Sequence, residues 1–138
     1  MPSSEARLLL GLTLLTVPTI IYGGLTVLAV VTVGEAGLPP AGLEPTALQT
    51  ALFRAGHAHA GVLLILSLVL QLALDGARLP DALRWSARIT APLAAILVSG
   101  GFFGLAFVPE LRLLLYLGAG ILAFATVTTG IGLLRARD

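Results

Sequence analysis

Four long apolar stretches constrain this chain more than any other feature. They cover about residues 8–33, 52–75, 86–108 and 112–134, and their central parts contain no charged residue. About 20 consecutive apolar residues in a helix cross the roughly 30 Å hydrocarbon core of a bilayer. Backbone polar groups find no water there, so each crossing segment must be helical. The sequence therefore predicts an all-α fold, a transmembrane four-helix bundle that forms one integral membrane domain over residues 1–138.

Composition supports this class and excludes others. The chain is 57% hydrophobic and only 11% charged, whereas a soluble domain carries about 25% charged residues. It has no cysteine, which removes disulfides and thiolate metal sites. With a net charge of +1 and no basic patch, nucleic acid is not an expected partner. The first stretch is too long for a cleaved signal peptide and is expected to remain as an anchor.

The arginines predict how the chain is threaded. Cytoplasmic loops retain positive charge, and six of the eight arginines fall on one side of the predicted membrane. These six are Arg7, Arg78, Arg84, Arg88, Arg135 and Arg137, whereas Arg54 and Arg112 fall on the other side. We therefore expect a multi-pass protein of the cell inner membrane with both termini in the cytoplasm.

Proline and glycine mark where the helices begin and end. A loop is expected over 34–44, which contains the pair Pro39-Pro40, and the second helix is expected to start near Thr46. Asp75-Gly76 should end one helix and Pro80-Asp81 should start the next. The short turn 109–112 should make the last two helices antiparallel. Arg84 and Arg88 are expected to reach the cytoplasmic headgroups by snorkelling.

Two histidines, His57 and His59, are the best clue to a site. They are the only histidines in the chain and lie at the outer end of the second apolar stretch. Imidazole is costly to bury in a membrane, and it ligates zinc, copper, nickel or haem iron. The alternative is that both rings sit at headgroup level with no ligand. We take His57 as the principal ligand and His59 as the secondary one.

Helical geometry separates the two histidines. At 100° per residue they point about 200° apart, so one helix cannot direct both rings at one ion. His57 shares a polar stripe with Arg54 and Gln71, which should face the bundle. Tyr116 is the expected hydrogen-bond partner of His57, and Tyr22 lies near a hydroxyl-rich face of the first span. These four polar residues are the predicted supporting residues of the site.

The chemistry of the ligand limits the ways in which it can be bound. A divalent transition metal would need a loop carboxylate from Glu35, Glu44 or Glu110 to complete its ligands. Haem needs two axial ligands on opposite faces of its ring, and only the second helix carries histidine. A haem held by two histidines of one chain is thus nearly excluded. A haem shared between two copies, or ligated by His57 and Tyr116, is allowed.

Two resemblances bear on the motif. His57-Ala58-His59 resembles the His-x-His pattern of haem-copper oxidase subunit I, in which two imidazoles on one helix ligate different haems. The match covers little beyond those three residues, and the further histidines of that subunit have no counterpart here, so oxygen reduction is not carried over. The segment 53–61 is similar to one in short, uncharacterised four-span membrane proteins of GC-rich bacteria, which implies no activity.

Other functions stay open at this stage. The chain contains no complete catalytic motif, so its catalytic residues are unknown. The alternatives to haem or metal binding are a small oligomeric transporter or channel and an accessory subunit of a larger membrane complex. A membrane enzyme with His57 as base and Tyr116 as acid ranks below them. A four-helix bundle of this size is narrow, so we expect self-association through small-residue faces.

Overall fold

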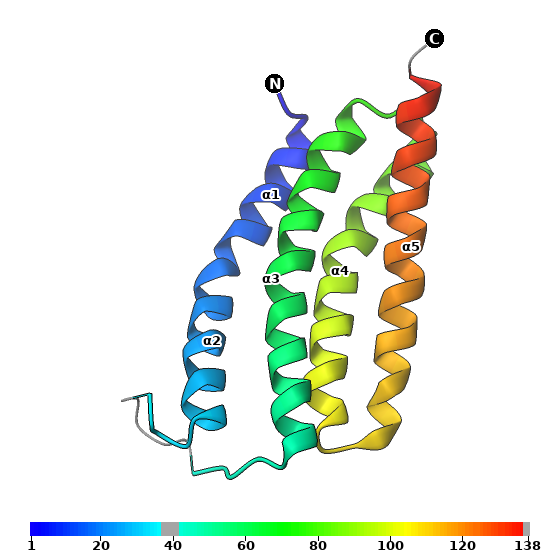
Figure 1. Cartoon of the computed structure of the whole chain (residues 1–138). Coiled ribbons are helices and arrows are strands. Elements are labelled where there is room, and N and C mark those ends of the chain that lie inside the picture. Colours follow the sequence, from blue (N-terminus) through cyan, green and yellow to red (C-terminus); the bar gives the residue numbers. More distant parts are fainter. Residues whose placement is uncertain (37–41, 137–138) are drawn as a thin grey trace.

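The computed structural model describes residues 1–36 and 42–136 and is all-helical over those residues. Its elements are α1 (Ser4–Leu15), α2 (Val17–Val31), α3 (Ala47–Asp75), α4 (Asp81–Leu105), the 3₁₀ turn η1 (Pro109–Leu111) and α5 (Arg112–Arg135). Figure 1 shows them side by side as a bundle, with the first residues of α1 and the last residues of α5 at the same end. The predicted loop pair Pro39-Pro40 lies outside the described residues.

Four helical segments are long and apolar enough to cross a membrane. They are Ser4–Val31, which combines α1 and α2, then Ala47–Asp75, Asp81–Leu105 and Pro109–Arg135. The sequence prediction of four helical spans is confirmed at this level. Many large apolar side chains are exposed on the bundle, including Leu15, Ile65 and Ile96, as expected of a surface that faces lipid.

The first span is interrupted at Thr16, two residues before Pro18. Pro18 has no N–H to donate to the carbonyl of Leu14, and α1 ends at Leu15. The N–H of Thr16 donates to the carbonyl of Thr13 at 3.1 Å, a shorter-range bond than in a regular α-helix. Pro18 thus gives the first span a joint at mid-length.

The start of α3 follows from its capping residues. Thr46 accepts a hydrogen bond from the Gln49 N–H at 3.2 Å, and the Gln49 side chain accepts one from the Thr46 N–H at 3.0 Å. This reciprocal capping box satisfies two helix-end donors. At 29 residues, α3 is about 44 Å long, which exceeds the thickness of a bilayer core. Its end at Asp75 and the start of α4 at Asp81 agree with the sequence prediction.

Small residues bring α4 and α5 into close contact. A Cβ atom on Gly118 would lie 2.7 Å from Val98 Cγ2, and one on Gly101 would lie 2.7 Å from Leu115 Cδ2. Neither position has room for a larger residue, so the hairpin formed by α4 and α5 depends on both glycines. The predicted antiparallel turn at 109–112 is present as η1 and the first residue of α5.

The first span is attached less tightly than the others. In its most apolar window 11% of the residues are buried, compared with 33% in both α3 and α4. The buried apolar clusters of the described residues lie within the other three spans and their connections, for example around Leu70, Ala91 and Ala125. The bundle is therefore a compact unit of α3, α4 and α5 with the jointed first span against one side.

Candidate functional site

Both histidines lie in the half of α3 that is distant from the chain termini (Figure 1). α3 begins at Ala47, so they stand about three turns into the helix. His57 is half-buried and His59 is exposed. The two rings contact different neighbouring helices, as the angular separation along the helix predicts.

His57 packs against the backbone of α2. A Cβ atom on Gly24 would lie 2.8 Å from both Cε1 and Nε2 of the His57 ring. Only glycine leaves space for that ring, so α2 covers Nε2 directly. Within the described residues, no hydrogen bond is made by the His57 imidazole. The α2 backbone thus restricts the approach of a bulky ligand to the Nε2 atom of His57.

His59 is held in a defined orientation on the other side of α3. Its Nδ1 lies 2.8 Å from the carbonyl oxygen of Ala55. A carbonyl only accepts, so Nδ1 carries the proton and donates it. The ring also packs against Phe102 of α4, with ring centroids 4.7 Å apart. In the neutral ring this arrangement leaves Nε2 with a free lone pair on an exposed side chain.

The predicted supporting residues do not gather around the histidines. Arg54 is exposed, and Tyr22 and Tyr116 are 73% and 69% exposed. The expected hydrogen bond between Tyr116 and His57 is absent from the described part of the chain, because the Tyr116 side chain points away from the bundle. Gln71 is 14 residues from His57, about 21 Å along the helix, and belongs to a separate cluster.

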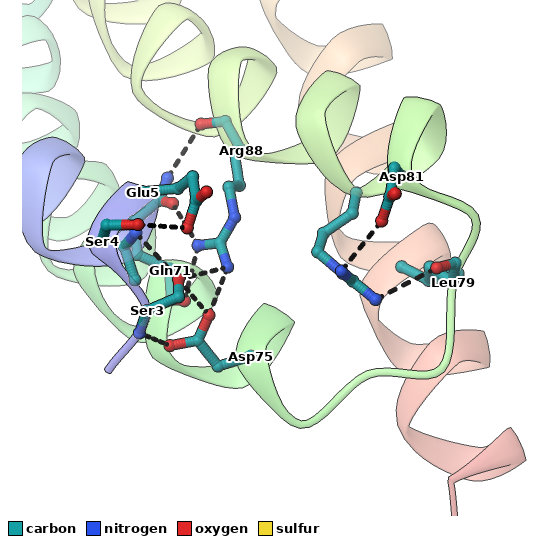
Figure 2. Close-up of polar contacts among 10 residues, drawn as sticks. Ser3, Ser4, Glu5, Gln71, Asp75, Leu79, Asp81 and Arg88 are labelled. Atoms are coloured by element: carbon teal, nitrogen blue, oxygen red, sulfur yellow. Dashed lines mark hydrogen bonds and ion pairs between the residues drawn. The ribbon is translucent and has the colours of Figure 1, made fainter. Parts of the chain in front are cut away.

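That separate cluster is centred on Arg88 (Figure 2). Arg88 is only 2% exposed, and its guanidinium pairs with the Asp75 carboxylate. It also donates to the backbone oxygen and to the side-chain oxygen of Gln71, at 3.0 and 3.1 Å. The expectation that Arg88 snorkels to the headgroups is therefore wrong, since a partner within the bundle satisfies its charge.

The cluster ties three helices together at the end that carries the termini. The Ser3 hydroxyl donates to Asp75 at 2.7 Å and the Ser3 N–H donates to the same carboxylate at 2.8 Å. The same hydroxyl accepts from the Ala6 N–H at 3.1 Å and so caps α1. Through these bonds the loosely packed first span is anchored to α3 and α4.

Pro92 explains one more bond in the cluster. It cannot donate to the carbonyl of Arg88, four residues earlier, and that carbonyl instead accepts from the Gln71 side chain at 2.8 Å. The signal in the sequence was the presence of Gln71, Asp75 and Arg88 inside predicted spans. Polar groups at such positions need partners.

The described part of the chain contains no complete metal site. Among residues 1–36 and 42–136, no three His, Asp or Glu side chains are close enough to hold an ion together. Searches of family models, curated proteins and solved structures found no match to this chain.

Proposed function

We propose that this protein is a multi-pass protein of the bacterial inner membrane that binds haem through His59. The first support is the distribution of charge. The exposed arginines Arg7, Arg78 and Arg135 lie at the end of the bundle that carries the termini (Figure 1). By the preference of cytoplasmic loops for positive charge, this end faces the cytoplasm. The histidines then lie toward the outer surface.

The observation that carries the proposal is the hydrogen bond from His59 Nδ1 to the Ala55 carbonyl. Histidine ligands of metals typically donate their second ring N–H to such an acceptor, which fixes the ring and directs the other nitrogen at the metal. Packing of the His59 ring on Phe102 restricts its rotation further. His59 therefore replaces His57 as the principal ligand, since Gly24 of α2 covers Nε2 of His57.

The count of protein ligands favours haem over a divalent ion. A structural zinc site needs about four protein ligands, and no group of three exists among the described residues. Haem iron needs at most two axial ligands from the protein. In this proposal His59 supplies one of them, and His59 of a second copy supplies the other from the opposite face of the ring.

The surface beside His59 is suited to such an approach. Ala51 and Ala58 are exposed and Ala55 is half-buried, and their spacing places them along one side of α3. Small residues allow a planar ring or a second helix to come close to the backbone. The second copy in this proposal meets α3 along these alanines.

The test is titration of the purified protein in detergent with haemin. We expect a Soret band with saturating stoichiometry of one haem per two chains. His59→Ala should abolish this band, whereas His57→Ala, the matched control on the same helix, should retain it. A band that His59→Ala leaves unchanged would contradict the assignment.

The mass of the complex in detergent provides a second measurement. Haem should shift the wild-type protein toward a dimer, and His59→Ala should show no shift on haem addition. The alternatives, a small transporter or channel and an accessory subunit, predict no saturable spectral change with haem. A flat titration with folded protein would therefore exclude the haem proposal.

A further inference from the structure

A cleft of about 450 Å³ separates the first span from α3 and α4. Leu12 of α1 and Ile20 of α2 line one wall, and Leu64 and Ile96 lie among the residues of the other helices that line it. No charged residue lines the cleft. Its volume falls in the range of about 300–1,000 Å³ that is usual for sites of small molecules.

Two serines that line this cleft have unpaired hydroxyls. Ser67 of α3 is 1% exposed and Ser99 of α4 is 8% exposed, and neither Oγ has a hydrogen-bond partner in the described structure. Helical hydroxyls usually satisfy themselves by donating to a carbonyl one turn earlier. Thr129 does so at 2.7 Å and Ser86 at 2.8 Å. Ser67 and Ser99 depart from this pattern, and both line the same cavity.

The cleft lies between parts that can separate. The first span has the smallest buried share of the four, and its joint at Thr16 is itself part of the cleft wall. The anchoring cluster around Arg88 holds only the α1 end of that span. Movement of the span about its joint would admit a molecule from the bilayer.

We propose that this cleft binds an uncharged, lipid-soluble molecule that carries at least one hydrogen-bond-accepting oxygen. The apolar walls and the lack of charged side chains exclude an ionic ligand, which would lose its hydration without a partner. A buried hydroxyl donor without an acceptor is satisfied by an oxygen such as that of a ketone, quinone or ester. A hydrocarbon chain would leave both hydroxyls unpaired.

The helix register gives the spacing of the two donors. Gln71 lies opposite Arg88, and Gly56 lies opposite Phe103, whose ring would be 3.0 Å from a Cβ on that glycine. α3 and α4 therefore pair residues whose numbers sum to 159, which places Ser67 opposite Pro92 and Ser99 opposite Ala60. The two serines are thus about 10 Å apart along the bundle. The bound molecule lies lengthwise in the cleft, with its oxygen at one of these two levels or oxygens at both.

The test is photolabelling of the protein in liposomes with an alkyl benzophenone, which has a carbonyl oxygen and inserts into nearby C–H bonds under ultraviolet light. We expect labelled residues to map to the cleft walls by mass spectrometry. The double variant Ser67→Ala/Ser99→Ala should weaken probe binding up to about tenfold, as loss of one hydrogen bond implies, because the single carbonyl of the probe reaches only one of the two serines. Ser86→Ala, whose hydroxyl is bonded outside the cleft, should bind like the wild type.

A competitor experiment separates an oxygen-binding cleft from a simple groove for lipid chains. An alkyl ketone should displace the probe, and an alkylbenzene of the same length should displace it far less. Leu64→Trp should fill the cleft and prevent labelling in a protein that melts like the wild type. Equal displacement by both competitors, labelling spread over the whole lipid-facing surface, or unchanged binding by the double serine variant would overturn the proposal. None of these measurements depends on haem binding at His59.

Discussion

At the scale of single residues, Arg88 is the side chain whose loss should damage the protein most. The Arg88 side chain is almost fully buried, and its guanidinium bonds to Asp75 and Gln71. Arg88→Ala would leave the Asp75 carboxylate without its cation. Because the Asp75 side chain is 22% exposed and keeps two bonds from Ser3, the cost is that of losing hydrogen bonds to a charged group, about 1.5–3 kcal/mol. We expect a large fall in melting temperature in detergent, measured by circular dichroism.

Arg84→Ala is the matched control for this prediction. Arg84 bonds to Asp81 at 3.1 Å, but the Asp81 side chain is 90% exposed. Exposed pairs contribute about 0–1 kcal/mol and the bond from Arg84 to the Leu79 carbonyl adds about 1 kcal/mol, so the melting temperature should fall less in Arg84→Ala than in Arg88→Ala. A larger loss in Arg84→Ala than in Arg88→Ala would mean that the Arg88 cluster does not anchor the bundle.

The two clusters also show what residue patterns can predict. The divergence of His57 and His59 follows from helical geometry alone and is confirmed by their contacts with Gly24 and Phe102. The partner of Arg88 could not be found in the same way. Spacing places Gln71 and Asp75 on one face of α3, but which neighbouring helix faces them depends on how the helices pack.

At the scale of helices, the contact between α2 and α3 depends on one glycine. Gly24→Ala would put a methyl group 2.8 Å from two atoms of the His57 ring, so the ring or the helix must shift. Because the clashing atoms are the end of the half-buried His57 side chain, which can turn aside, the cost should lie near the lower end of the about 1–3 kcal/mol usual for overpacking. We expect a lower melting temperature and a changed imidazole signal for His57 in nuclear magnetic resonance spectra.

Gly23, the neighbouring residue, provides the matched control for Gly24→Ala. A Cβ on Gly23 meets no atom within 4 Å, so Gly23→Ala adds the same methyl group to α2 without a clash. It should leave the His57 signal unchanged and keep or slightly raise stability, since alanine favours a helix. If both variants behave alike, α2 does not pack on His57 as described.

Helix boundaries were the most predictable features at this scale. Thr46, Gly76 and Pro80 carry local signals, and the helices begin and end beside them. The two prolines within spans behave differently, because their surroundings differ. At Pro18 the helix is interrupted, whereas α4 continues through Pro92 while the Gln71 side chain occupies the carbonyl left unpaired. A sequence shows where a backbone bond is lost, but not whether a neighbouring helix replaces it.

At the scale of the whole molecule, orientation in the membrane is the property that connects the two proposed sites to cell compartments. The chain has no cysteine, so a single introduced cysteine can be labelled without background. Glu110 lies in η1 and Asp81 starts α4, at opposite ends of the bundle, and both are exposed. The ion pair of Arg88 with Asp75 does not change the expected orientation in the membrane. Without Arg88, the arginines at the end with the termini still outnumber Arg54 and Arg112 at the other end.

We therefore expect Glu110→Cys to react with a membrane-impermeant maleimide in intact spheroplasts. Asp81→Cys should react only after the membrane is opened, since the distribution of arginines predicts a cytoplasmic position for it. Both should react to the same extent in detergent, which controls for accessibility. The reverse pattern would place His59 near the cytoplasmic surface, where haem would be delivered from inside the cell. The cleft between the first span and α3 would be unaffected, because it opens to the bilayer in either orientation.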